Sequence, residues 1–165
     1  MNYFYFDPSA LIKRYHVELG TENVDYLLDN LLAEHPVRIT TSVWSIPETI
    51  AALNRHKNER RIPETQFSIL LLSFLYEARN FEILNISEDK LFRSIDLILQ
   101  HNLNSADALH LVSIQDASEV VSLAGNNFIV VVSDKRFLRA ARREGFTALN
   151  PEDTDTTEID RLILE

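Results

Sequence analysis

The stretch NYFYFDPSAL, residues 2–11, indicates how the chain is built. Residues 3–6 are all aromatic, which is typical of a buried β-strand. They lead directly into Asp7, and Pro8 favours the first turn of a helix. Because the residue before a proline is pushed toward extended geometry, Asp7 is expected at the corner between these two elements. The stretch therefore predicts a strand that ends in a carboxylate and continues as a helix to about Tyr15.

The same order of strand, carboxylate and helix returns in FIVVVSDKRF, residues 128–137. Residues 128–133 are the most β-branched run of the chain and are therefore predicted to form a central strand. Asp134 follows this strand, and a helix is predicted over residues 135–144 because Gly145 is a suitable C-cap. Two carboxylates are thus expected where strands give way to helices.

Helices and short strands alternate along the rest of the chain. Apolar spacing and helix-start signals predict further helices at residues 21–34, 43–57, 63–79, 87–101 and 105–117. Further strands are predicted at residues 37–42, 81–86 and 147–150. Strands separated by helices imply a three-layer α/β/α fold with a mainly parallel central sheet of about five strands. We assign residues 1–151 to this domain and residues 152–165 to an acidic C-terminal tail.

Composition narrows the class of protein. The chain has 165 residues, which is the size of one ordinary domain, and it contains no cysteine, so disulfides and thiolate metal sites are excluded. The longest apolar run, residues 68–76, is far shorter than the roughly 20 residues of a membrane helix. The start MNYFYFDPS lacks the basic residues and cleavage site of a signal peptide. We therefore expect a cytoplasmic protein without a membrane segment.

The charge distribution is uneven. The formal net charge is −9, which by itself argues against a nucleic-acid partner. However, six acids and only one arginine lie in residues 151–165. Eleven of the sixteen Lys and Arg residues fall in three short stretches, at residues 13–14, 55–61 and 135–143. For any single stretch, a solvated helix face is the simpler interpretation.

Asp7 and Asp134 are the first candidates for a functional site. In a parallel sheet, ligand sites form beyond the carboxyl ends of the strands, and both residues are expected at such ends. Each alone is explained equally well as a helix N-cap, for which Asp is a preferred residue. Ser9 alone is explained as a residue of the first helical turn, and Ser133 alone as a cap.

Asp107 is the third candidate. Ser105 is expected to cap the helix at residues 105–117, so Asp107 falls in the first turn, where the helix dipole favours an acid. His110 lies three residues later on the same side of the helix. Beside Leu111, His110 is interpreted as a packed histidine rather than as a metal ligand.

Glu48 is the fourth candidate. Its neighbours one turn away, Trp44, Ala51 and Ala52, are all apolar. A glutamate on such a face is not a simple solvent-facing residue. Pro47 indicates that the helix restarts there, which would place Glu48 near a helix start. A half-exposed glutamate without a function is an equally good interpretation.

The combination of acids is harder to explain by structure alone. Charged carboxylates about 4 Å apart repel each other by about 4 kcal/mol at an effective dielectric constant near 20. Such a cluster persists only if protons or cations neutralise it. Oxygen ligands without cysteine favour Mg²⁺ or Mn²⁺. A carboxylate-held pair of Mg²⁺ ions is suited to the hydrolysis of phosphodiesters.

The acids lie in four segments that resemble the motifs of the PIN domain family, and most closely its VapC-type ribonuclease toxins. The segments are YFDPSALIKRY, SVWSIPETIAAL, SADALHL and VVSDKRFLRAARREGFTALNP, and the resemblance spans roughly residues 3–151. The resemblance implies a metal site, a supporting hydroxyl near the first acid and a second hydroxyl before the last acid. The implied metal ligands are Asp7, Glu48, Asp107 and Asp134, and the implied hydroxyls are those of Ser9 and Ser133. It also implies Mg²⁺ or Mn²⁺, an RNA substrate, a homodimer and an antitoxin partner.

The basic residues that follow the acids complete the functional hypothesis. They are predicted to surround the metal site and to hold RNA phosphates. These residues are Lys13, Arg14, Arg55, Lys135 and Arg136. The leading interpretation is a Mg²⁺- or Mn²⁺-dependent endoribonuclease, with a non-catalytic PIN-like binding protein or scaffold as the alternative.

Two other classes of α/β protein fit the sequence less well. A dehalogenase-type phosphatase requires a second Asp two positions after the first, where this chain has Ser9. A response-regulator receiver requires a phosphorylated Asp after a central strand in mid-chain, and no acid of this chain fits that position well.

Overall fold

The computed structural model describes residues 1–164. Its strands are β1 (Asn2–Phe6), β2 (Ile39–Ser42), β3 (Glu82–Leu84), β4 (Asn127–Val131) and β5 (Thr147–Leu149). Its α-helices are α1 (Pro8–Tyr15), α2 (Thr21–Glu34), α3 (Ser45–Asn58), α4 (Glu64–Glu77), α5 (Glu88–His101), α6 (Ser105–Leu123), α7 (Lys135–Arg143) and α8 (Thr156–Leu164). Short 3₁₀ helices lie at Pro36–Arg38 and Ala78–Asn80.

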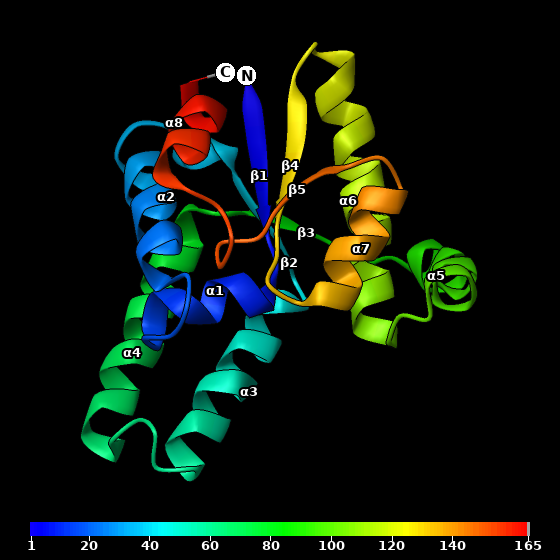
Figure 1. Cartoon of the computed structure of the whole chain (residues 1–165). Helices are drawn as coiled ribbons and strands as arrows, with labels where there is room; N and C mark the ends of the chain where they lie inside the picture. The colour runs from blue at the N-terminus through cyan, green and yellow to red at the C-terminus, as the bar shows by residue number, and fades with distance from the viewer. Residues whose placement is uncertain (165) are drawn as a thin grey trace.

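The strands form one parallel sheet in the order β3-β2-β1-β4-β5. Figure 1 shows helices on both sides of this sheet, with α1, α2 and α8 on one side and α5, α6 and α7 on the other. The predicted three-layer α/β/α fold is therefore confirmed, with five strands in the described residues 1–164.

Alternating side chains of the central strands fill two cores. Phe4 and Phe6 are fully buried on the side of α2, whereas Tyr5 between them is fully buried on the side of α6 and α7. In β4, Val131 joins the first core and Val130 the second. This is the pattern expected of central parallel strands, whose successive side chains point to opposite faces and are covered on both.

The strand order places a crevice beside β1. The chain runs outward from β1 through β2 to β3, and then returns to pair β4 with the other edge of β1. The backbone N–H of Asp7 donates to the carbonyl of Val131 at 3.0 Å, so the ends of β1 and β4 lie next to each other. Reversals of strand order of this kind are where α/β proteins bind ligands.

The described part of the predicted acidic tail belongs to the domain. Residues 156–164 form α8, and Ile159 and Leu162 are buried in the same core as α2. Arg38 Nη1 donates to the carbonyl of Ile163 at 2.9 Å, which ties α8 to the 3₁₀ helix that precedes β2. The acidic segment thus packs on the domain through α8 rather than forming a separate tail, and Glu165, the last residue of the predicted tail, lies outside the described residues.

Gly20 is a point of close approach between α2 and the segment after β5. Its φ is +88°, and a Cβ there would lie 2.9 Å from the carbonyl carbon and oxygen of Pro151. We expect Gly20→Ala to lower the free energy of unfolding by about 2–3 kcal/mol, because a strained backbone and a clash add up. Urea unfolding measures this loss.

Gly125→Ala is the matched control. Gly125 also has a positive φ, +74°, but no atom lies within 4 Å of the position of an added Cβ. Gly125→Ala should lower the free energy of unfolding by about 1 kcal/mol, from backbone strain alone. Equal losses in the two variants would show that the contact with Pro151 has no energetic role.

Candidate active site

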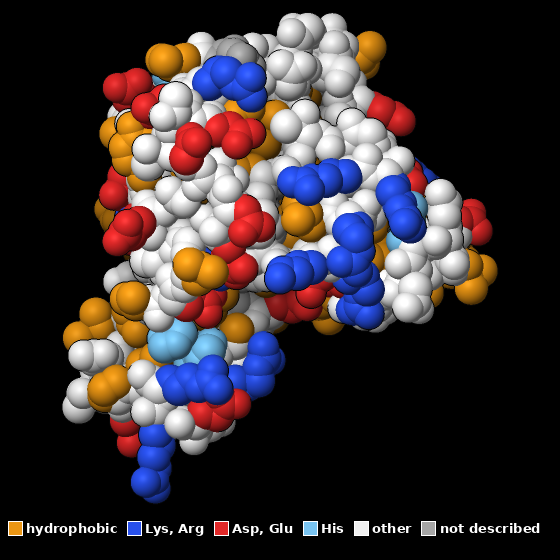
Figure 2. Space-filling view, viewed as in Figure 1, with side chains coloured by type: hydrophobic (Ala, Val, Ile, Leu, Met, Phe, Trp, Pro, Cys, Tyr) orange, Lys and Arg blue, Asp and Glu red, His pale blue; other side chains and the backbone are white. Residues whose placement is uncertain are grey.

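A pocket of about 290 Å³ lies beyond the carboxyl ends of β1 and β4. All four predicted acids line it, namely Asp7, Glu48, Asp107 and Asp134. Ser9, Arg55, His56 and His110 line it as well. In Figure 2, acidic side chains gather at the lower end of α7, where α1 and α3 also begin in Figure 1. The structure therefore brings together side chains that are up to 127 positions apart in the chain.

Asp7 is held by Ser9. Asp7 is the N-cap of α1 and only 4% exposed, and its Oδ2 accepts hydrogen bonds from the backbone N–H and the hydroxyl of Ser9. No hydrogen bond within residues 1–164 reaches Oδ1 of Asp7. The capping interpretation of Asp7 is therefore correct, and one carboxylate oxygen is still available to a ligand.

Ser9 also connects the two strand ends. Its Oγ accepts the backbone N–H groups of Ser133 and Asp134 at 3.0 and 3.1 Å. Asp134 in turn caps α7, because its Oδ1 accepts from the N–H groups of Arg136 and Phe137, both at 2.8 Å. One hydroxyl thus fixes the spacing between the first and the last acid of the pocket.

Removing this hydroxyl should loosen the pocket. Ser9→Ala deletes one donated and two accepted hydrogen bonds, and we expect the free energy of unfolding to fall by about 2–3 kcal/mol. Ser133→Ala is the control, because Ser133 Oγ has no hydrogen-bond partner in the described part of the chain. Its removal should change the free energy of unfolding by less than about 0.5 kcal/mol. Thermal and urea unfolding measure both. A Ser9→Ala protein as stable as Ser133→Ala would contradict the proposed connection.

Asn104, rather than the predicted Ser105, caps α6. Asn104 Oδ1 accepts from the N–H of Asp107 at 2.8 Å, and Asn104 Nδ2 donates to Asp107 Oδ2 at 2.9 Å. The Asn104 amide accepts through its oxygen and donates through its nitrogen, so the residue that caps the helix also orients the Asp107 carboxylate. Arg136 Nη2 lies 3.6 Å from the same Oδ2.

Mutual repulsion and burial raise the pKa values of two acids. Burial raises the pKa of Asp7, opposed by the charge of His110 and the hydrogen bonds of Ser9, and the charge of Glu48 adds to the rise. Burial, followed by the charges of Asp7 and Asp134, raises the pKa of Asp107 to about 6. Burial is the larger cause in both cases, and the contributions of neighbouring carboxylates show that the acids lie close enough to repel one another.

Glu48 is positioned by a histidine. It lies in the first turn of α3, as the sequence predicted, and its Oε2 is 2.7 Å from Nε2 of His110. His110 Nδ1 lies 2.8 Å from the hydroxyl of Tyr5, and burial raises the pKa of this phenol well above its ordinary value. His110 is only 1% exposed. It is a packed histidine, as expected, but it also orients a pocket carboxylate.

The three-residue spacing between Asp107 and His110 could have identified His110 as a pocket residue. Residues three apart on a helix share a face, so Asp107 at the pocket places His110 at the pocket as well. Its partners Glu48 and Tyr5 lie 62 and 105 positions away, and no local pattern identifies them.

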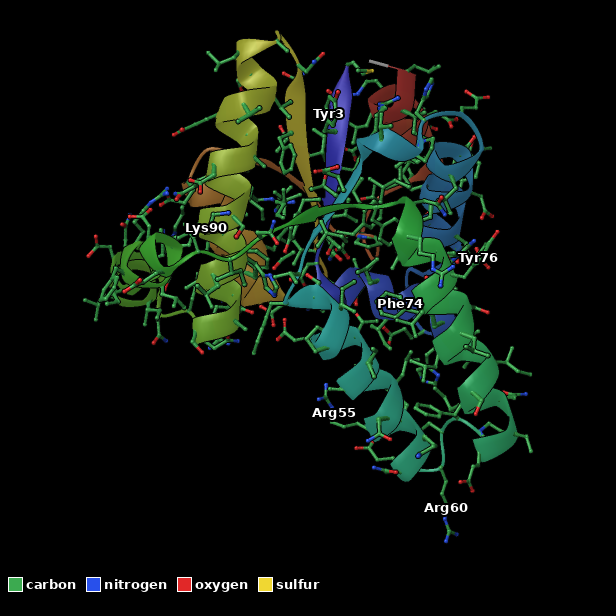
Figure 3. The ribbon with its side chains drawn as sticks, turned by 180° about the vertical axis from the view of Figure 1, so that it is seen from behind. Tyr3, Arg55, Arg60, Phe74, Tyr76 and Lys90 are labelled. Carbon is green, nitrogen blue, oxygen red and sulfur yellow. The ribbon has the colours of Figure 1, made fainter. Side chains whose placement is uncertain are left out.

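The predicted substrate-binding cations divide into two groups. Arg55 lines the pocket, and Figure 3 shows it projecting from α3 on the side away from α4. Arg136 lies beside Asp107, and Lys135 is exposed at the first position of α7. These three cations surround or adjoin the pocket.

Lys13 and Arg14 do not reach the pocket. Lys13 is 3% exposed, and its Nζ lies 3.0 Å from Glu18 and 2.8 Å from Glu152. Arg14 forms ion pairs with carboxylates on α2 and α4, which are Asp25, Asp29 and Glu77. Since both cations are engaged in internal ion pairs, we do not retain them as phosphate-binding residues.

The donor set is chemically suited to a hard divalent cation. The pocket offers four carboxylates with excess negative charge and no sulfur. Within residues 1–164, however, no three His, Cys, Asp or Glu side chains form a ready-made ligand cage. Mg²⁺ commonly keeps several waters and uses one or two carboxylates, so an open set of this kind fits that ion.

A model of the PIN domain family matches residues 4–143. The chain therefore belongs to the PIN domain family, whose members are generally nucleases. No curated protein sequence matches the chain. None of the helices in the described residues 1–164 has the length and apolar character of a membrane span.

Several solved structures share the fold. PAE2754 from Pyrobaculum aerophilum is 16% identical, with a TM-score of 0.61 over 99% of this chain and 96% of that one. FitAB bound to an IR36 DNA fragment is 14% identical, with a TM-score of 0.64 over 92% and 97%. A toxin–antitoxin complex from Klebsiella pneumoniae is 20% identical, with a TM-score of 0.50 over 89% and 96%. At these identities, the likeness establishes the fold alone.

Proposed function

We propose that this PIN-domain protein is an endoribonuclease that depends on Mg²⁺ or Mn²⁺ and hydrolyses RNA phosphodiester bonds. The observation that carries the proposal is the convergence of four carboxylates on one pocket at the reversal of strand order. The raised pKa values of Asp7 and Asp107, caused first by burial and then by neighbouring carboxylates, support it, because a bound cation would favour the ionised form of both acids.

The side chains have distinct roles in this proposal. Asp7, Glu48, Asp107 and Asp134 hold the cation, which when bound lowers the pKa of the attacking water and stabilises the leaving oxygen. Ser9 keeps Asp7 and the end of β4 in register. His110 orients Glu48.

Cations at the rim hold the substrate. Arg55 and Arg136 bind the phosphates on either side of the scissile bond, with Lys135 at the edge of the pocket. Because these contacts go to the backbone of RNA, they position the strand without selecting its sequence.

The biological role that we propose is that of a toxin with an antitoxin partner, acting as a homodimer in the cytoplasm. Support comes from the sequence resemblance and from a structural neighbour that is described as a toxin–antitoxin complex. Co-expression with the product of an adjacent gene, followed by size-exclusion chromatography with light scattering, tests partner and dimer together.

The nuclease activity is tested by incubating the purified chain with end-labelled RNA in Mg²⁺, in Mn²⁺ or in EDTA. We expect internal cleavage with either cation and none with EDTA. Cation-dependent RNA binding without cleavage would instead support the alternative, a non-catalytic PIN-like binding protein.

A further inference from the structure

Helix α7 has two chemically different faces. Its sequence, KRFLRAARR, contains five basic residues and no acid. The four apolar residues, Phe137, Leu138, Ala140 and Ala141, are all buried against the sheet. The basic residues consequently occupy the outer face, and Figure 2 shows Lys and Arg side chains gathered over this helix.

Three of these cations have no ion-pair or hydrogen-bond partner for their side chains within residues 1–164, namely Lys135, Arg139 and Arg143. Arg136 approaches Asp107, and Arg142 Nη2 donates to the carbonyl of Ala148 at 3.0 Å. Lys13, Arg14 and Arg93 form ion pairs elsewhere in the fold, whereas Arg55, Arg60 and Arg79 form none within residues 1–164. What distinguishes α7 is that its unpaired cations gather on one face of one helix, in a chain with a net charge of −9.

The stability of the helix does not explain this face either. Cations are favourable in the last turn of a helix, which accounts for Arg142 and Arg143. Lys135 and Arg136, however, occupy the first turn, where the helix dipole disfavours positive charge. An external polyanion is the simplest compensation.

We propose that the outer face of α7, formed by Lys135, Arg139 and Arg143, is a track for the backbone of an RNA strand whose neighbouring phosphodiester occupies the pocket. This inference rests on the proposed function and extends it to a surface outside the pocket. The track is continuous with the pocket, because Asp134 lines the pocket and caps α7.

The dimensions of α7 suit such a strand. A helix rises about 1.5 Å per residue, so nine residues span about 13 Å. Stacked nucleotides advance about 3.4 Å each, so the face covers three to four phosphates. Lys135, Arg139 and Arg143 follow one another at four-residue intervals along one side of the helix.

An acidic protein segment is the competing occupant, and continuity with the pocket favours RNA. A strand that is cut in the pocket must leave it on some side, and α7 begins there with an unpaired lysine. An acidic peptide has no bond to be cut in the pocket, so the proposed function gives it no reason to run from α7 to the pocket.

The test is the salt dependence of RNA binding. Fluorescence anisotropy measures the affinity of a short single-stranded RNA across a KCl series, in the Asp7→Asn background to prevent cleavage. Each phosphate contact with a single strand contributes about −0.7 to the slope of log K against log salt. Arg139→Gln/Arg143→Gln should therefore make the slope less steep by about 1.4.

Arg60→Gln/Arg79→Gln is the matched control. It removes the same charge from two exposed arginines that are not on α7 and form no ion pair within residues 1–164, one between α3 and α4 and one before β3. We expect its slope to equal that of the parent. An unchanged slope in the α7 variant, or equal reductions in both variants, would overturn the inference.

Two further measurements separate the possible failures. Displacement of RNA by polyglutamate of equal charge, with the same dependence on Arg139 and Arg143, would overturn the RNA track in favour of an acidic protein partner. If the parent cleaves RNA but the salt slope of the Arg139→Gln/Arg143→Gln variant is unchanged, the RNA track is wrong and the nuclease proposal stands. If the salt slope of the variant is reduced but the parent does not cleave RNA, the RNA track is supported and the nuclease proposal is wrong.

Discussion

Replacing Asp7 with asparagine is expected to reduce RNA cleavage more than 100-fold while leaving the fold intact. Asparagine keeps an oxygen that accepts the N–H of Ser9, so the cap of α1 survives. It removes the negative charge that the proposed cation requires, and even residues one step removed from a metal typically cost 10–100-fold in activity. End-labelled RNA and single-turnover kinetics measure the loss.

Asp7→Asn should lose activity but not stability. Asp7 is 4% exposed, and burial raises its pKa, with the charge of Glu48 adding to the rise. A neutral side chain avoids this unfavourable ionisation, so in EDTA at pH 7 the variant should unfold at the same temperature as the parent or higher. Asp96→Asn, on the exposed face of α5, is the control for both measurements. An Asp7→Asn protein with full activity would end the catalytic assignment.

The second large effect concerns pH. The pKa of Asp107 is raised to about 6, whereas an unfolded Asp titrates near 3.9. Between these two values the folded protein binds more protons than the unfolded chain, so the free energy of unfolding falls as pH rises from about 4 to about 6. Above pH 6 the full penalty remains, and it is on the order of 1–2 kcal/mol once solvent screening of this partly exposed carboxylate is included.

We therefore expect the protein in EDTA to be more stable at pH 5 than at pH 7.5, as measured by chemical unfolding. Asp107→Asn should flatten this dependence, since the amide does not titrate. Adding Mg²⁺ at pH 7.5 should raise the stability of the parent and have much less effect on Asp107→Asn. A parent that becomes steadily more stable from pH 5 to pH 7.5, with no difference in Asp107→Asn, would refute the charge cluster.

Local signals were sufficient for the features that depend on neighbouring residues. Pro8 after Asp7 indicated a strand-to-helix corner, and the β-branched run before Asp134 indicated a central strand. Once strands and helices alternate, the geometry of parallel sheets brings these two ends together without further information. The order of elements and the convergence of the acids were predictable for this reason.

Features that depend on distant partners were not predictable. Lys13 follows an acid by six positions, which suggested a role at the pocket, but its partner Glu152 is 139 positions away. Residues 152–165 read as an acidic tail because charge dominates their composition. Ile159 and Leu162 nevertheless share one face of α8 and bury it against α2.

The central claim is that the four carboxylates together hold a divalent cation, and Mn²⁺ binding tests it most directly. Electron paramagnetic resonance reports free Mn²⁺ during titration of the parent, Asp7→Asn and Asp96→Asn. We predict saturable binding by the parent and by Asp96→Asn, and an affinity at least 10-fold weaker for Asp7→Asn. Equal Mn²⁺ affinity in all three proteins, or no binding by the parent, would contradict the account.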